Sequence, residues 1–377
     1  MQLRAVIGPA PCVAPWLVPW LVPGLVSMSM VGTAAAQSDV TAGLRTSAYV
    51  DDDATFISTS TASVQGAVTD ELTLRGRYLA DVVTSASVDV VTAATGRWNE
   101  IRHEAEGATT WTDGTRSLSG QYIYSVEADW ESHTATGGAS HDFNQHNLTL
   151  ALGGSYVHNR IGRADDANFH RRMSVYGGSA SAVVVAGPRD IWRLGYTVSL
   201  ADGYQASPYR FARFADPLAP EGLPLAQEEV HPQTRLRHAV TLAWNHKAFE
   251  ATFVRSHLRA YADDWGLVSL TGGAEYDMVF GPVTVGGIAR GYAQQGAAFY
   301  EDLYPSRRRY MTADRELSSF FDVFAGGRIG LQRPLRGAIE RIRVEVELIG
   351  FGFWFPSFSE LPRRLGVISE LGVGLEF

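Results

Sequence analysis

The feature that most constrains the fold is a strict alternation of apolar and polar residues, clearest in the last segment of the chain. From Leu365 to Phe377 every second residue except Ser369 is large and apolar, whereas the intervening positions are mostly glycine or glutamate. Successive side chains of a β-strand point to opposite faces, so this pattern predicts a strand with one apolar and one polar face. The apolar face suits lipid, and the face with carboxylates and glycines suits a water-filled lumen.

The same alternation recurs upstream, with charges of both signs on the polar face. It is clear within residues 72–82, 265–280, 317–332 and 339–355. Such charges do not fit the dry core of a β-sandwich, so the pattern favours a closed barrel with a wet interior. The residues expected to line this lumen are Arg75, Arg77, Glu275, Asp277, Arg328, Arg341, Arg343, Glu345, Glu347 and Glu370.

These runs predict an all-β fold, a transmembrane antiparallel up-and-down β-barrel. They give about sixteen strands, or roughly fourteen if weak early strands merge. Connections after even-numbered strands are mostly tight, whereas those after odd-numbered strands include every long one. Outer-membrane barrels have short periplasmic turns and longer external loops, so the first strand is expected to start in the periplasm. The expected strands cover residues 42–50, 54–68, 72–82, 98–111, 116–126, 132–143, 148–161, 170–186, 191–201, 236–246, 249–261, 265–280, 283–296, 317–332, 339–355 and 364–377.

Aromatic residues gather near both expected ends of the strands, as in the interfacial girdles of membrane barrels. Near the periplasmic ends lie Trp111, Phe143, Trp192, Trp244, Phe249, Phe280 and Phe377, and near the external ends lie Tyr49, Trp98, Tyr156, Tyr204, Tyr261, Trp265 and Trp354. A terminal phenylalanine on an alternating strand resembles the signal read by the bacterial barrel-assembly machinery. The expected partners are therefore outer-membrane lipids, lipopolysaccharide and this machinery.

The first 36 residues are expected to be a cleavable signal peptide rather than part of the fold. Arg4 precedes an apolar stretch at residues 13–31, and small residues follow at Ala34 and Ala36. Prolines interrupt the stretch, which argues against a membrane anchor. Residues 37–377 then form one predicted outer-membrane barrel domain, without cysteine because Cys12 is the only one in the sequence. A formal net charge of −8 argues against a nucleic-acid partner.

Short motifs are spread along most of this domain. They are Tyr49-Val50-Asp51-Asp52-Asp53, Tyr78-Leu79-Ala80-Asp81, the segment from Ser85 to Ala94, Gly203-Tyr204, Ser207-Pro208-Tyr209-Arg210, Asp263-Asp264-Trp265-Gly266 and Thr312-Ala313-Asp314-Arg315-Glu316-Leu317. Together they resemble an uncharacterised family of bacterial outer-membrane proteins, a domain of unknown function common in myxobacteria and related Gram-negative bacteria. The resemblance implies an outer-membrane location and a barrel, and no activity, because none is established for the family.

The segment from Ser85 to Ala94 is small and apolar where an external loop is expected to be polar. Asp81, Ser85, Ser87 and Asp89 mark it as a loop at the barrel mouth. One interpretation is a loop that folds into the mouth, where it constricts the opening or supports a bound ligand. The other is a loop packed against its neighbours for stability.

Charged residues at the external connections are candidates for ion binding. Arg307, Arg308 and Arg309 suit anionic sugar or phosphate groups of lipopolysaccharide, or form a solvated loop tip. The carboxylates could hold calcium, but they lack the ordered spacing of a calcium loop, so we predict neither a metal site nor a cofactor. These carboxylates are Asp51, Asp52, Asp53, Asp165, Asp166, Asp263, Asp264, Glu301 and Asp302.

Three functions fit such a barrel. The first is a passive porin-like channel or small-solute transporter, with residues 202–235 and 297–316 controlling access. The second is a closed structural, adhesive or ligand-binding barrel, in which the lumenal charges pair instead of forming a field across a pore. The third, a surface hydrolase using Asp263, Asp264, His257 and His133, lacks any known hydrolase motif, so we predict that the protein is not an enzyme.

Overall fold

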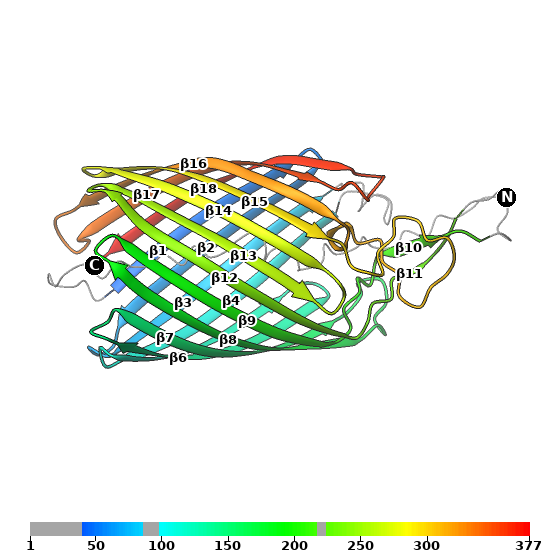
Figure 1. Ribbon diagram of the computed structural model, residues 1–377, viewed down its shortest axis with the longest axis horizontal. Coiled ribbons are helices and arrows are strands. Elements are labelled where there is room, and N and C mark those ends of the chain that lie inside the picture. Colours follow the sequence, from blue (N-terminus) through cyan, green and yellow to red (C-terminus); the bar gives the residue numbers. More distant parts are fainter. Residues whose placement is uncertain (1–39, 86–97, 217–223) are drawn as a thin grey trace.

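The computed structural model describes residues 40–85, 98–216 and 224–377. Within these ranges sixteen long strands form one closed antiparallel barrel (Figure 1), which confirms the predicted fold class and the higher of the two strand counts. The wall strands are β1 (Val40–Asp51), β2 (Thr55–Ala67), β3 (Leu72–Ser85), β4 (Trp98–Thr112), β5 (Arg116–Val126), β6 (Trp130–Phe143), β7 (Leu148–Ile161), β8 (Arg171–Gly187), β9 (Asp190–Gly203), β12 (Thr234–Phe249), β13 (Thr252–Asp263), β14 (Val268–Phe280), β15 (Val283–Gln295), β16 (Phe320–Pro334), β17 (Arg341–Trp354) and β18 (Arg363–Glu376).

The barrel closes because its first and last strands pair with each other. β1 runs antiparallel to both β2 and β18, with Thr41 opposite Glu376 and Asp51 opposite Gly366 on the β18 side. The backbone N–H of Phe377 donates to the carbonyl of Val40 at 3.0 Å. Every wall strand therefore has two hydrogen-bonded neighbours, as lipid requires of a spanning sheet.

The two ends of the barrel differ, and we call them the turn end and the loop end. At the turn end short turns join β2 to β3, β8 to β9 and β14 to β15, and the chain terminates there (Figure 1). At the loop end the long connections are residues 204–233, 296–319 and 355–362. This is the asymmetry predicted from the sequence.

Several expected strands begin later than predicted, and in two of them, β14 and β16, turns occupy the first expected residues. Ahead of β14 the side chain of Asp263 accepts from the backbone N–H groups of Trp265 and Leu267, and Gly266 has φ +84°. Ahead of β16 the chain forms a 3₁₀ turn, η2 (Arg315–Leu317), whose N-cap Asp314 accepts from the N–H of Glu316. Among the described residues no helix is long and apolar enough to cross a membrane.

The wall has the predicted alternation of outer and inner faces. On β14 the side chains of Val268, Leu270 and Tyr276 are exposed on the outside, whereas Thr271 and Asp277 are buried inside. Leucines such as Leu44 and Leu152 are about two-thirds exposed on the outer surface. Exposed apolar side chains of this kind suit contact with lipid.

The inner face departs from the expected polar pattern at the loop end of β16 and β17. Phe320, Phe324, Phe351 and Phe353 point inward there and form a buried cluster with Tyr49 of β1. Phe355 and Phe358 of the 355–362 loop belong to the same cluster. The phenylalanines are lumenal because a folded loop covers them, so they are shielded from water.

Candidate functional site in the capped lumen

A large cavity occupies the barrel interior. Its volume is about 1590 Å³, and it reaches the turn end, where Pro188 and Arg189 of the β8–β9 turn line it. Its lining contains ten arginines and lysines but only six aspartates and glutamates. The cavity is therefore richer in positive charge than the protein as a whole, which has a formal net charge of −8.

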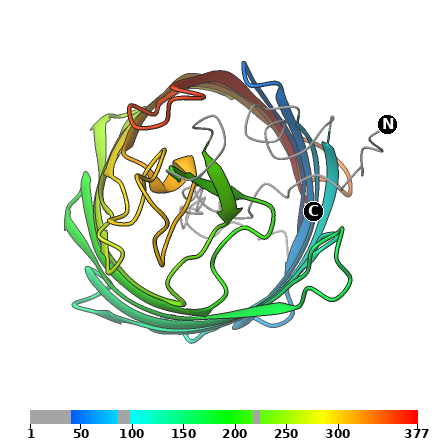
Figure 2. The same cartoon turned by 90° about the vertical axis from the view of Figure 1, so that its right-hand side faces the viewer.

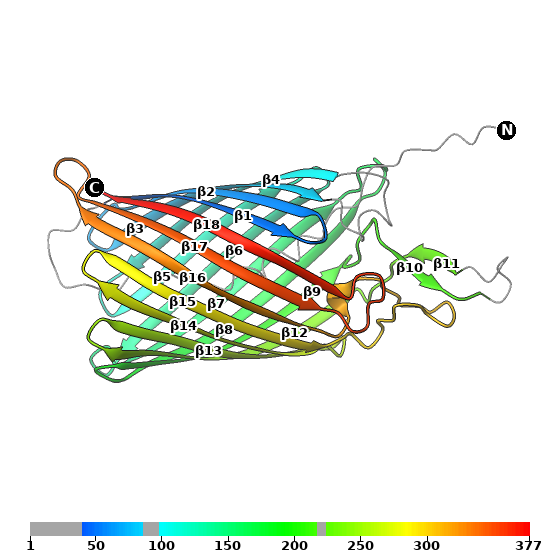
Figure 3. The same cartoon turned by 90° about the horizontal axis from the view of Figure 1, so that it is seen from above.

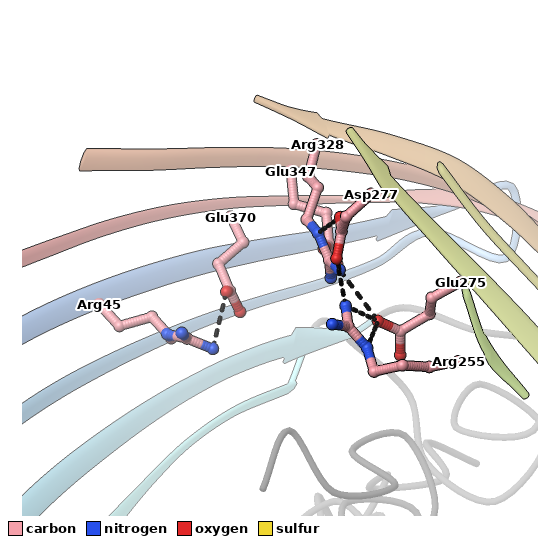
Figure 4. Close-up of polar contacts among 7 residues, drawn as sticks. All are labelled: Arg45, Arg255, Glu275, Asp277, Arg328, Glu347 and Glu370. Carbon is pink, nitrogen blue, oxygen red and sulfur yellow. Dashed lines mark hydrogen bonds and ion pairs between the residues drawn. The ribbon is translucent and has the colours of Figure 1, made fainter. Parts of the chain in front are cut away.

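A dense group of lumenal charges comes from β13, β14, β16 and β17 (Figure 4). The guanidinium of Arg328 donates to Asp277 at 2.6 Å and to Glu275 at 3.0 Å, while Arg255 of β13 contacts the same two carboxylates at 2.5 and 2.8 Å. Glu347 of β17 lies 3.9 Å from Arg328. Together these residues form an ion-pair network rather than isolated pairs.

The network depends on a glycine in the strand between its partners. Gly286 of β15 lies opposite Asp277 on one side and opposite Arg328 on the other. A Cβ at this position would come within 2.3 Å of Asp277 Oδ1 and 2.9 Å of Arg328 Cγ. Because glycine has no side chain, Asp277 of β14 and Arg328 of β16 can contact each other across β15 on the lumenal face.

Most of the other residues expected in the lumen also lie in pairs. Glu370 contacts Arg45 at 2.9 Å (Figure 4). At the turn end, Arg343 donates to the neutral side chain of Gln332 at 3.2 Å, and Glu345 also lines the cavity. The remaining pairs are Arg75 with Glu106, Arg77 with Glu104 and Glu106, and Arg341 with Glu376.

The excess of positive charge is concentrated on three adjacent strands. Arg193 of β9, Arg237 and Lys247 of β12, and Arg255 and Arg259 of β13 all line the main cavity, and we call them the basic wall. Arg237 lies near the loop end of β12 and Lys247 near its turn end. The basic wall therefore extends along most of the cavity.

Two long connections cover the loop end of the barrel, and we call their described residues, 204–216, 224–233 and 296–319, the cap. The first contains β10 (Phe211–Phe214) and β11 (Leu225–Glu228), which pair with each other and lie beyond the ends of the wall strands (Figures 1 and 3). Seen from the loop end, the cap lies across the opening (Figure 2). The sequence placed these two loops over the mouth but did not predict the strands within them.

The two halves of the cap are joined by backbone hydrogen bonds. The N–H of Val230 donates to the carbonyl of Met311 at 3.1 Å, and the N–H of Met311 returns the bond at 3.0 Å. Phe214 forms a parallel bridge with Tyr304, whose side chain is fully buried.

The cap is also fixed to several connections around the rim. The hydroxyl of Tyr209 donates to Asp129 of the β5–β6 turn, and Arg315 contacts Asp53 of the β1–β2 turn at 3.4 Å. Ser359 of the 355–362 loop donates to Asp302 at 2.5 Å. These contacts attach the cap to three connections of the rim, of which the β1–β2 turn and the 355–362 loop are adjacent.

A buried carboxylate lies at the centre of the cap. Glu229 accepts from the hydroxyl of Thr312 at 2.8 Å and from the N–H of Ala313 at 2.7 Å, and its second oxygen lies 3.5 Å from His231 Nε2. Burial alone would raise the pKa of Glu229, but the positive charge of Arg210, the contact with His231 and the bond from Thr312 together lower it to about 2. Glu229 thus joins the cap halves as an anion.

Only part of the predicted mouth loop can be placed. Asp81 is buried and bonded to Arg102 of β4, and Ser85 pairs through its backbone with Trp98 at the end of the barrel wall. Ser87 and Asp89 lie outside the described residues. Whether the 85–94 segment constricts the mouth stays a prediction.

The carboxylates expected at the external connections act mainly as structural acceptors. Asp51 accepts from the hydroxyl of Tyr49 and the N–H of Thr55, and Asp263 pairs with Arg235 at 2.6 Å. Arg308 of the basic triplet contacts Glu301 at 2.7 Å. These contacts give Asp51, Asp263 and Arg308 structural roles.

A different group of carboxylates meets at the β5–β6 turn, and the sequence did not single it out. One oxygen from each of Glu100, Glu127 and Asp129 lies within 4.8 Å of the others. Burial raises the pKa of Glu127, with the nearby charge of Asp129 adding to the effect.

The residues considered for hydrolysis do not meet. His257 lines the main cavity, whereas Asp263 ends β13 at the loop end and Asp264 follows it in the turn. His133 is bonded to Tyr122, an exposed outer residue of the barrel wall, at 2.6 Å.

The sequence profile of one protein family matches part of the chain. The description of this family is "Protein of unknown function (DUF3570)", and the match covers residues 169–340. It includes the motifs at 203–210, 263–266 and 312–317, and it confirms the resemblance seen in the sequence. The motifs at 49–53 and 78–94 lie outside the matched range. A search of curated proteins finds no match.

Solved structures show the fold that the chain shares. It is similar to CdiB from Acinetobacter baumannii (7% identity, TM-score 0.51, covering 89% of this chain and 60% of that one). It is also similar to a bacterial polysaccharide outer membrane secretin (11% identity, TM-score 0.50, covering 91% of this chain and 100% of that one). The siderophore receptor PirA from Pseudomonas aeruginosa matches 85% of this chain, with 11% identity and a TM-score of 0.42. The matched part is just over half (57%) of the receptor's own length. The barrel is thus of the outer-membrane type.

Proposed function

We propose that the protein is a passive, porin-like channel for small solutes and that the cap controls access to it. The observation that carries this proposal is the charged cavity of about 1590 Å³, which reaches the turn end and lies beneath the cap. A lumen lined by charged and polar side chains is what a water-filled pathway requires.

The loop end is proposed to face the cell exterior, with the outer face of the barrel in contact with membrane lipid and lipopolysaccharide. The long connections at that end support this orientation, because outer-membrane barrels have short periplasmic turns and longer external loops. On the outer face, exposed tyrosines near the middle of their strands bond to histidines: Tyr78–His103 at 2.7 Å, Tyr122–His133 at 2.6 Å and Tyr196–His238 at 2.7 Å. We also propose that the barrel-assembly machinery recognises Phe377 at the end of the last strand.

The second candidate is a closed barrel that binds a ligand without conducting. It is favoured by the joined halves of the cap and by the pairing of most lumenal charges. The two candidates differ in one respect that can be measured, because a channel requires the cap to open.

A reversible cross-link across the cap tests the proposal. Val230 and Met311 exchange two backbone hydrogen bonds, and such a pair has its Cα atoms about 5.5 Å apart, within disulfide range. The described residues contain no cysteine, so Val230→Cys with Met311→Cys adds the only two thiols to this part of the chain. The protein would be refolded into planar bilayers and its single-channel current recorded.

Wild type and the reduced double variant should show intermittent openings, and oxidation should abolish them in the double variant alone. The Val230→Cys single variant under the same oxidant is the matched control. Openings that persist after oxidation would show that the cap is not the gate. Silence from folded, inserted wild type and from the reduced variant would reject the channel and leave the closed barrel.

A further inference from the structure

A second, smaller cavity lies between the cap and the barrel wall. Its volume is about 160 Å³, and we call it the chamber. It shares Arg237 and Arg290 with the lining of the main cavity, so the two cavities adjoin. Aromatic rings form much of its wall, namely Tyr261, Trp265, Tyr292, Phe320 and Phe353.

The chamber contains a buried cation with an unused hydrogen-bond donor. Arg364 of β18 is only 5% exposed, and its Nε has no hydrogen-bond partner among the described residues. Its Nη2 forms an ion pair with Glu316 at 3.8 Å, beyond hydrogen-bond distance, and the guanidinium lies 4.5 Å from the ring centre of Phe353. Leaving a charged donor buried and unbonded costs free energy, so the position favours an anion that is supplied from outside the chain.

Neighbouring groups leave further hydrogen-bonding atoms unused around the same space. Arg290 donates to Asp322 through Nη1 at 3.2 Å, while its Nε has no partner among the described residues. The side-chain oxygen of Gln205, from the cap, is likewise unbonded. Five arginines line the chamber against three carboxylates, so its lining is positive overall.

We propose that the chamber binds a small organic carboxylate with a planar, apolar body. The carboxylate would accept from Arg364 and Arg290, since guanidinium groups pair with carboxylates through two parallel hydrogen bonds. The apolar body would pack among the surrounding aromatic rings. A cavity of about 150 Å³ holds a benzene-sized molecule, which sets the ligand near the size of benzoate. This inference deepens the proposed function, because the chamber lies between the cap and the main cavity.

Calorimetric titration of the full refolded chain in detergent tests the proposal without a conducting pore. Benzoate should bind, whereas benzamide, which has the same shape without the charge, should bind at least about tenfold more weakly. Inorganic phosphate should also bind at least about tenfold more weakly, because it cannot use the aromatic wall. Equal binding of benzamide or of phosphate would overturn the proposal, as would the absence of benzoate binding.

Two variants locate the binding in the chamber. Arg364→Gln should weaken benzoate binding at least about tenfold, and glutamine keeps a hydrogen-bond donor near Glu316, which lies 3.8 Å from the arginine. Leu267→Trp fills the chamber and keeps every charge, so it should weaken binding as well. Arg343→Gln, in the main cavity, is the matched control and should bind like wild type.

Unchanged binding by both chamber variants would place the site elsewhere and reject the inference. Binding without any conductance would reject the channel and keep the chamber site. Conductance without benzoate binding would reject the chamber site and keep the channel.

Discussion

At the scale of single residues, Arg328 best shows how the lumen is held together. Its side chain is only 9% exposed, and it bonds to Glu275 and Asp277 while lying near Glu347. Replacing it with a neutral residue leaves three carboxylates close together with Arg255 as the remaining cation. Loss of one partner from a buried ion-pair network is far more costly than loss of an exposed pair.

We therefore predict that Arg328→Met lowers the free energy of unfolding by about 3 kcal/mol. Arg343→Met is the control, because Arg343 is exposed and its partner Gln332 is neutral, and it should cost less than about 1 kcal/mol. Urea unfolding in lipid vesicles, followed by tryptophan fluorescence, measures both. Equal effects would show that the network contributes no special stability.

The sequence indicated which face these charges occupy, but not their pairing. Alternation is a local property, so Glu275, Asp277 and Arg328 could be assigned to one face from their neighbours alone. The bond between Asp277 and Arg328 depends on the register of three strands and on Gly286 between them. Nothing local to either residue specifies that register.

At the scale of elements, the wall strands and the position of the two covering loops were predictable, but the internal structure of the cap was not. The expected strand at residues 148–161 is β7 with the same bounds, because a period of two is visible within one segment. The cap depends on contacts such as that of Glu229 with Thr312, which are 83 residues apart. The chamber is equally non-local, since Arg290 and Arg364 come from different strands. The run from Phe351 to Phe355 was the one local sign of a covered inner face.

The central carboxylate of the cap makes its closure sensitive to acid. The pKa of Glu229 is lowered in the folded cap to about 2, from an ordinary value of 4.5. A lowered pKa means that the charged form contributes stability above about pH 4.5, and that this contribution is lost as the pH falls toward 2. The groups facing it are Arg210, which also pairs with Asp314 at 2.9 Å, and His231.

We predict that the open fraction of wild-type channels rises when the pH on the loop side falls from about 5 to about 3. Glu229→Gln should be more open at neutral pH, because it loses charge-assisted bonds worth about 2 kcal/mol, and it should not respond to this pH change. Recordings at fixed voltage compare the two proteins. A rise of the same size in Glu229→Gln would assign the acid response to another group.

At the scale of the whole molecule, the charge of the lumen opposes that of the protein. The net charge is −8, yet ten cationic side chains face six acidic ones in the main cavity. Low-dielectric walls focus the field of the charges that line a channel, so the local lining and not the net charge should set ion preference. An open barrel should therefore prefer anions.

Reversing charge on the basic wall tests this preference. Arg193→Glu with Lys247→Glu should reduce the ratio of chloride to potassium permeability by about threefold or more. Arg116→Glu with Arg336→Glu changes the total charge equally at turn-end positions outside the cavity lining, and should leave the ratio near wild type. The shift should be larger in dilute salt, since the screening length is about 30 Å at 0.01 M but about 3 Å at 1 M. Reversal potentials recorded in a salt gradient measure this permeability ratio. Equal shifts in both double variants would mean that surface charge governs selectivity.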